Sequence, residues 1–381
     1  MTATWKQNYP FLARIEGDLI YGLLLAVCAI IATLLRKKAS LEIRRNVDGI
    51  IGFIITVVIC KQVAFYSLVV VLAHLVAIRF LPHRQLVLFS FYGTFIYLGF
   101  LRVIHNFGFP KLEFIGNAIQ LLMTLRVIGL SYEIFDSKES ERRKLEKKDD
   151  DETKKDENRR FINVPSTWEA FNYCYSFIGL FTGPYYTYQT YYDAMHSEHL
   201  QKISVRSLLL AKIKTLSWTL PTLIGFYILG PVESSDGFRS GMRAWNRSVQ
   251  FWLANFVYKR SHKAIRMPYT MFISAFWHGI HPGYFLSFLT IPLCTTAEDL
   301  VFAAIPRDEK TGQHPRWFSI IWRFIRMKGF EMMACGFLLL TWEDTVRLWS
   351  CLYWWLHFFM ITIAGISFLI VSIRKKPKKK E

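Results

Sequence analysis

Four stretches of this 381-residue chain are as long as a membrane-spanning helix and contain no Asp, Glu, Lys or Arg. They are Leu19–Leu35, Gln62–Ile78, Gln85–Leu101 and Ser350–Ile373. A helix needs ~20 apolar residues to cross the hydrocarbon core of a bilayer, and a soluble domain has no interior that holds several such helices. We therefore predict an all-α fold: a polytopic transmembrane helical bundle with about 8–10 membrane segments, some of them re-entrant.

Other apolar segments are interrupted by residues that disfavour a straight span. Ile50–Ile78 is broken at Lys61, which predicts two short spans in place of one long helix. A further span is expected at roughly Leu112–Leu130. Arg126 lies near its cytosolic end, where the side chain is expected to snorkel towards water. The run Thr182–Pro184 favours a re-entrant or interfacial piece, and Leu216–Gly230 contains a proline that makes it a marginal span.

Basic residues exceed acidic ones, giving a net charge of +18, and the surplus lies at the ends of apolar segments. Clusters such as Arg36–Lys38 and Arg374–Lys380 are typical of cytosolic loops that contact anionic lipid, so the charge does not indicate nucleic-acid binding. Residues 136–160 are almost devoid of apolar side chains and are expected to form a solvated cytosolic loop or frayed helix. We expect residues 1–381 to form a single membrane-embedded domain.

The C-terminal residues 374–381 form a basic tail directly after a span, and the positive-inside rule places this tail in the cytosol. Lys378 and Lys379 stand fourth and third from the end and resemble the dilysine signal that retrieves resident proteins to the endoplasmic reticulum. The alternative is a plain basic anchor. The expected location is the endoplasmic reticulum membrane, with a multi-pass topology.

His278 lies inside the otherwise apolar stretch Met271–Cys294, which is long enough to span a membrane. An ionisable side chain at that depth indicates a functional site, although a histidine satisfied by a neighbouring carbonyl explains it equally well. Trp277 adds bulk beside the imidazole, Gly279 allows another group to approach closely, and Pro282 is expected to break the helix just beyond.

Asn246 is the second candidate, on Met242–Arg260, which has the pattern of an interfacial amphipathic helix. It also begins a glycosylation sequon, Asn246-Arg247-Ser248, which matters only if this segment is lumenal. An imidazole that removes a proton from an alcohol, helped by an amide that holds the oxyanion, would suit acyl transfer. The side chains expected to contact substrate are Arg243, Trp245, Gln250, Ser274 and Trp277.

Common catalytic motifs are missing from the chain. It has no G-x-S-x-G, H-E-x-x-H, P-loop or G-x-G-x-x-G motif, and its six cysteines lack C-x-x-C spacing. These observations disfavour serine hydrolases, zinc proteases, nucleotide-binding enzymes, disulfide frameworks and zinc sites.

Several short motifs resemble those of the membrane-bound O-acyltransferase family, and are closest to its lysophosphatidylinositol acyltransferase branch. They are Met242–Asn246, Ser274–Gly279, His281–Tyr284, Thr182–Tyr186 and Tyr284–Cys294. The resemblance implies a helical bundle with a tunnel in which acyl-CoA meets a lysophospholipid. By this resemblance, His278 corresponds to the family's catalytic histidine and Asn246 to the asparagine that accompanies it.

What the resemblance implies is transfer of a fatty acyl group, expected to be polyunsaturated, from acyl-CoA to the sn-2 hydroxyl of lysophosphatidylinositol. A thioester is already activated, so no cofactor is expected beyond acyl-CoA as co-substrate; the oligomeric state is not predicted. The branch carries further hydrophobic segments where this chain has only Pro231–Ser240. An inactive lipid-binding relative or a truncated isoform is therefore the alternative. A secondary transporter is disfavoured, because the sequence shows no internal repeat.

Overall fold

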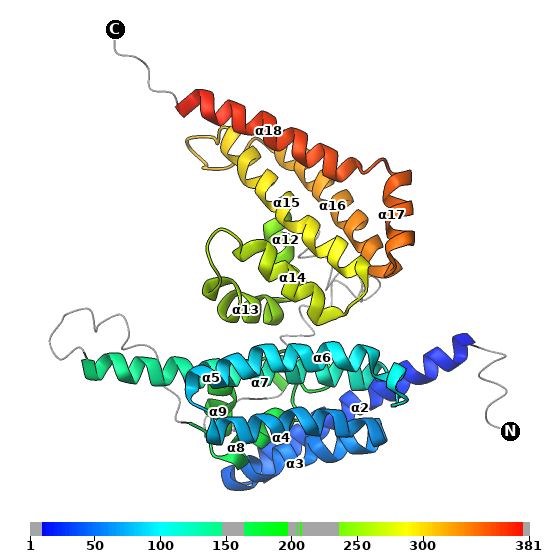
Figure 1. Ribbon diagram of the computed structural model, residues 1–381, viewed down its shortest axis with the longest axis vertical. Coiled ribbons are helices and arrows are strands. Elements are labelled where there is room, and N and C mark those ends of the chain that lie inside the picture. Colours follow the sequence, from blue (N-terminus) through cyan, green and yellow to red (C-terminus); the bar gives the residue numbers. More distant parts are fainter. Residues whose placement is uncertain (1–9, 147–163, 197–203, 205, 208–235, 376–381) are drawn as a thin grey trace. The chain divides into compact units, whose positions relative to one another are not determined.

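The computed structural model describes residues 10–146, 164–196, 204, 206–207 and 236–375, and these residues contain helices but no strands (Figure 1). The chain divides into two compact units, residues 1–207 and 208–381. Five helical stretches are long and apolar enough to cross a membrane: Leu41–Phe80, His83–Phe107, Phe114–Arg143, Pro282–Ala304 and Trp355–Arg374. A shorter apolar helical stretch covers Tyr21–Arg36. The predicted all-α, multi-span class is confirmed, whereas the predicted segment Leu216–Gly230 lies outside the described residues.

The first unit consists of helices joined by short 3-10 and π turns. Its elements are α2 (Pro10–Lys38), α3 (Leu41–Cys60), η1 (Lys61–Val63), α4 (Ala64–Phe80), α5 (His83–Leu88), η2 (Phe89–Gly93), α6 (Thr94–Val103), η3 (Ile104–Phe107), α7 (Phe114–Glu146), α8 (Thr167–Tyr175) and α9 (Tyr188–His196). The predicted interruption at Lys61 is confirmed: this residue ends α3 with a φ of 49°, a backbone conformation that does not continue a helix.

Arg126 is completely buried on α7, so the prediction that it snorkels to water is wrong. Its guanidinium donates hydrogen bonds of 2.8–3.1 Å to the carbonyl oxygens of Tyr173, Cys174, Ser176 and Ile178, and to the Tyr186 hydroxyl at 2.9 Å. These acceptors lie at the end of α8 and in the non-helical segment that leads to α9. The arginine therefore donates the hydrogen bonds that the carbonyl groups of this irregular segment need inside a membrane protein.

The charged segment 136–160 is helical in its first part, because α7 continues to Glu146. Arg142 pairs with Glu139 one turn away at 2.7 Å, the local pairing that keeps a polar helix formed. Residues 147–160 lie outside the described range.

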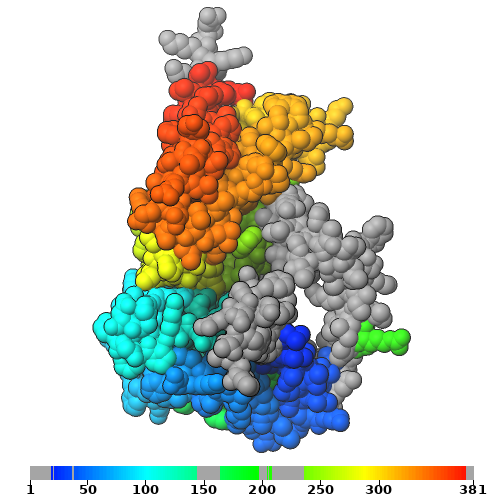
Figure 2. Space-filling model, turned by 90° about the vertical axis from the view of Figure 1, so that its right-hand side faces the viewer, coloured from blue at the N-terminus to red at the C-terminus, as the bar shows by residue number. Residues whose placement is uncertain are grey.

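The second unit is built around α15 (Pro282–Ala304), which packs against α14 (Arg266–His278), α16 (Arg316–Leu339), α17 (Trp342–Cys351) and α18 (Trp355–Lys375) (Figure 1). Its other elements are α12 (Phe238–Trp245), α13 (Arg247–Phe256) and η6 (Tyr258–Arg260). Figure 2 shows α17 and α18, orange to red, on one surface of this unit, where α18 exposes apolar side chains such as Phe358 and Ile361. Exposed apolar side chains are expected on a helix that contacts lipid.

Met271–Cys294 is not one helix, so the predicted break just beyond His278 is confirmed, and the stretch does not form a single span. α14 ends at His278, three non-helical residues follow, and α15 begins at Pro282. Proline suits a first helical position because a backbone N–H there would have no partner within the helix, so its absence costs nothing. The break therefore lies at residues 279–281, directly before Pro282, and Pro282 starts the next helix.

Candidate active site

His278 occupies the last position of α14, and its half-buried imidazole lies among aromatic rings. The ring centroids of Trp277, Phe337 and Phe288 lie 4.8, 5.0 and 5.2 Å from it, and that of Tyr284 lies at 5.9 Å. Phe288 is stacked on the imidazole with an interplanar angle of 23°. This aromatic enclosure restricts the rotation of the imidazole and excludes water from much of its surface, as a group that handles a proton at a defined position requires.

Gly279 allows the Tyr284 ring to lie close to the end of α14. A Cβ at position 279 would lie 2.9 Å from a ring carbon of Tyr284, which is closer than such atoms normally approach. The prediction that this glycine permits a close approach is therefore confirmed, and the group that approaches is Tyr284.

Small residues bring α15 and α16 together directly behind His278. The Gly283 N–H donates to the Leu340 carbonyl at 2.8 Å, and Ser287 Oγ donates to the Met333 carbonyl at 2.7 Å. A Cβ at Gly283 would collide with the Gly336 carbonyl oxygen. Small residues in this i, i+4 pattern allow two helix backbones to pack closely in a membrane. The contact places Phe337, the residue after Gly336, against the imidazole.

Asn246 lies at a break between two helices, so the interpretation of Met242–Arg260 as one continuous amphipathic helix is wrong. The residue is the C-cap of α12 and the N-cap of α13, with φ −144° and ψ 87°. Its Oδ1 accepts hydrogen bonds from the Val249 N–H at 3.2 Å and from Ser248 Oγ at 3.1 Å. Asparagine is among the preferred N-cap residues, so part of its role here is structural.

Glu298 on α15 holds the other end of α12. Its carboxylate accepts hydrogen bonds from the N–H groups of Phe238 at 2.5 Å and Arg239 at 3.2 Å, and from the Trp322 indole at 3.1 Å. A carboxylate at a helix N-terminus satisfies free N–H groups and complements the helix dipole. This buried glutamate therefore ties the short helix that ends at Asn246 to the spanning helix beside His278.

The predicted substrate-contacting residues fall into two groups. Ser274 and Trp277 are buried on α14, in the same helix as His278. Arg243, Trp245 and Gln250 are exposed on α12 and α13, on either side of Asn246. Placement in one unit is compatible with a shared site, and the roles of His278, Asn246 and these five residues stay predictions.

Sequence reasoning missed several residues that shape this region. Tyr284 and Phe288 are four residues apart on α15, a spacing that could have indicated a shared helical face towards His278. Phe337 and Glu298 had no such signal, because each acts through a partner distant in sequence.

Comparison with known proteins defines the class. Residues 219–341, which include His278 and Asn246, match the model of the membrane-bound O-acyltransferase family. Membrane-bound acylglycerophosphatidylinositol O-acyltransferases named mboa-7 are 31% identical in Caenorhabditis briggsae and 32% identical in Caenorhabditis elegans, each alignment covering 87% of this chain and 90% of the relative. The human protein MBOAT7, of the same description, is 27% identical over 87% of this chain and 89% of its own length.

The fold and these matches define a multi-span membrane enzyme of the O-acyltransferase class. The chain belongs to the membrane-bound O-acyltransferase family, as its motifs predicted. The alignments with the two Caenorhabditis proteins extend over 427 and 428 positions, more than the 381 residues of this chain. These relatives therefore carry residues that this chain lacks.

Proposed function

We propose that this enzyme transfers a fatty acyl group from acyl-CoA to the sn-2 hydroxyl of a lysophospholipid, with lysophosphatidylinositol as the preferred acceptor. The observation that carries the proposal is the match over 87% of the chain to relatives named acylglycerophosphatidylinositol O-acyltransferases. The acyl group is proposed to be polyunsaturated, on the resemblance to this branch alone. The proposed location is the endoplasmic reticulum membrane with a cytosolic C-terminus, a region of which residues 376–381 lie outside the described structure.

His278 is the proposed general base. Its neutral imidazole accepts the proton of the sn-2 hydroxyl as the oxygen attacks the thioester carbonyl, and the tetrahedral intermediate then collapses with cleavage of the C–S bond. The imidazolium returns the proton to the departing CoA sulfur, so that a thiol and an ester are the products. The stacked Phe288 ring holds the imidazole in place. A thioester is activated without metal or redox help, so no cofactor is proposed beyond acyl-CoA.

Asn246 is the proposed partner of this step, orienting the acceptor or stabilising the oxyanion with its amide nitrogen. Its Oδ1 already accepts hydrogen bonds in α13, which leaves the Nδ2 hydrogens as the donors for this role. Arg243 and the neighbouring exposed cations are proposed to attract the phosphate groups of both substrates.

The test is acyl transfer in microsomes with labelled acyl-CoA and a panel of lysophospholipids. Alanine in place of His278 is expected to lower turnover by ~10²–10⁴-fold, the usual effect of losing a general base. His105→Ala removes an exposed histidine of η3 and serves as the matched control, with activity expected to stay at the parental level. Near-parental turnover of the His278→Ala protein at equal expression would refute the assignment.

The length of the alignments favours one alternative, a lipid-binding relative or truncated isoform without turnover. The acyl-transfer assay, together with a measurement of lysophosphatidylinositol binding to the same protein, separates the two functions. If the parental protein binds lysophosphatidylinositol but transfers no acyl group to it from any acyl-CoA tested, the alternative is supported and the proposal is refuted.

A further inference from the structure

Glu298 is a buried carboxylate on the spanning helix α15. Its oxygens accept hydrogen bonds from two other helices, α12 and α16. Oε2 accepts from the Phe238 N–H at 2.5 Å and from the Trp322 indole at 3.1 Å, and Oε1 accepts from the Arg239 N–H at 3.2 Å. An ionisable side chain inside a spanning segment is costly to bury, so its presence there indicates a function.

The helix that Glu298 holds, α12, is too short to keep its position unaided. It has eight residues, and isolated helices of that length are marginal even for the best helix formers. The buried Phe238 ring packs against Phe330, with centroids 5.4 Å apart. Arg239 pairs with Asp299, but these side chains are 39% and 61% exposed, and exposed pairs contribute little. The Glu298 carboxylate and the Phe238 ring therefore fix the N-terminal end of α12.

The opposite end of α12 carries Asn246. At 1.5 Å per residue, Asn246 lies about 12 Å along the helix from the Phe238 N–H that Glu298 holds. A tilt of about 5° about that end therefore moves Asn246 by about 1 Å. A misplacement of ~1 Å in a reacting group can lower a rate ~10²-fold. The placement of Asn246 thus depends on a contact more than two helical turns away.

We propose that Glu298 is a positioning residue for acyl transfer, which sets the place of the Asn246 amide by holding the N-terminus of α12. This role rests on the proposed function, in which Asn246 orients the acceptor or stabilises the oxyanion. Glu298 acts through α12 and not on the reacting atoms. Its loss should therefore lower kcat and leave the KM values of both substrates nearly unchanged.

Two variants perturb this contact from opposite sides. Glu298→Gln keeps the shape of the side chain but replaces an acceptor oxygen with an NH2 group, so at least one N–H donor loses its acceptor. Gly237→Ala leaves Glu298 intact and places a methyl group in collision with its carboxylate. Gly237 has an extended φ of −161°, so alanine adds no backbone strain there. Each variant is expected to lower kcat about 10-fold and to change KM by less than about two-fold.

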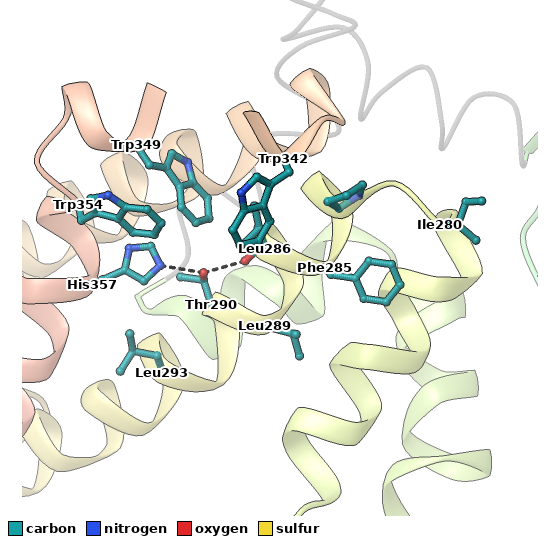
Figure 3. Close-up of a pocket in the computed structure, with 11 residues that line it drawn as sticks. Ile280, Phe285, Leu286, Leu289, Thr290, Leu293, Trp342, Trp349, Trp354 and His357 are labelled. Carbon is teal, nitrogen blue, oxygen red and sulfur yellow. Dashed lines mark hydrogen bonds between the residues drawn. The ribbon is translucent and has the colours of Figure 1, made fainter. Parts of the chain in front are cut away.

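Thr290→Val is the matched control on the same helix. Figure 3 shows the Thr290 hydroxyl hydrogen bonded to His357 of α18, at 3.1 Å, in a contact between helices that does not involve α12. Valine has a similar shape and removes this bond. The control should therefore lower the melting temperature, as the loss of a buried hydrogen bond does, and keep kcat near the parental value.

A double-mutant cycle with Asn246→Ser tests whether Glu298 acts through Asn246. Serine removes the amide but is an equally good N-cap residue for α13. The assay uses labelled acyl-CoA and lysophosphatidylinositol with the purified full-length protein in nanodiscs. Asn246→Ser alone is expected to lower kcat ~10²–10³-fold, the effect of losing an oxyanion donor. In that background Glu298→Gln should lower kcat by less than about two-fold, because no amide is left to misplace.

Hydrogen exchange measures the contact independently of activity. Peptides from residues 238–245 should exchange faster in the Glu298→Gln and Gly237→Ala proteins, because the hold on the N-terminus of α12 is weakened. They should exchange at the parental rate in the Thr290→Val protein. Thermal unfolding shows which variants are folded, and Gly237→Ala carries the cycle if Glu298→Gln does not fold.

The outcomes distinguish this role from the proposed function. Unchanged exchange of residues 238–245, or a 10-fold loss of kcat that persists in the Asn246→Ser background, would overturn the role of Glu298 and leave the proposed function standing. An equal loss of kcat in the Thr290→Val protein would also overturn it, because any weakened helix contact would then suffice. Parental kcat in the Asn246→Ser protein would instead refute the proposed role of Asn246, and the role of Glu298 with it.

Discussion

The substitution Gly283→Ala is expected to disturb both stability and catalysis through one contact. The added methyl group would collide with the Gly336 carbonyl oxygen and lie 2.9 Å from Leu340 Cα, and both are backbone atoms that cannot rotate away. Relief requires α15 and α16 to separate, which also strains the hydrogen bond from the Gly283 N–H to the Leu340 carbonyl. Overpacking of this kind typically costs ~1–3 kcal/mol.

For a unit of this size, a loss of ~2 kcal/mol corresponds to a melting temperature lowered by about 4–8 °C. Movement of α16 also shifts Phe337, which contacts the His278 imidazole. A misplacement of ~1 Å at a catalytic group can lower turnover ~10²-fold, so acyl transfer is expected to fall more than stability alone explains. The measurements are thermal unfolding of the purified protein and initial rates well below the melting temperature.

Gly365→Ala is the matched control, because it makes the same change inside α18, where an added Cβ would meet no atom within 4 Å. Alanine is the better helix former by ~1 kcal/mol, so this variant should unfold at or slightly above the parental temperature. The reasoning is refuted if Gly283→Ala and Gly365→Ala unfold at the same temperature and retain the same rate.

Two further substitutions and one C-terminal extension test other parts of the molecule. Asn246→Gln should lower acyl transfer without any change in gel mobility; an endoglycosidase-sensitive shift that this variant removes would place Asn246 in the lumen and contradict its catalytic role. Arg126→Lys should weaken the hold on residues 173–178, because an ammonium cannot match the planar guanidinium, and should cost about 3 kcal/mol or more and increase proteolysis of that segment. A parental cleavage rate would contradict the anchoring role of Arg126. Two alanines appended after Glu381 preserve charge but displace the dilysine pattern, so the protein should leave the endoplasmic reticulum; unchanged localisation would eliminate the retrieval signal.

The class of fold follows from local sequence, because several apolar runs of about membrane-spanning length are stable together as helices in a bilayer and not in a soluble core. The break at Lys61 and the close approach at Gly279 were predictable for a similar reason, since each depends on neighbouring residues.

What the sequence alone determined is therefore the multi-span helical class and the polar residues that lie within or beside apolar segments. Only the tertiary structure decided how those polar residues are satisfied. Arg126 turns inward because irregular backbone some fifty residues away needs donors, and Glu298 faces α12 because a helix N-terminus sixty residues away lies against it. The aromatic enclosure of His278 is completed by Phe337 from another helix, which small residues allow to approach. The physical reason is that burial makes each unpaired polar group costly, and its partner is selected by proximity in space, which a local pattern does not encode.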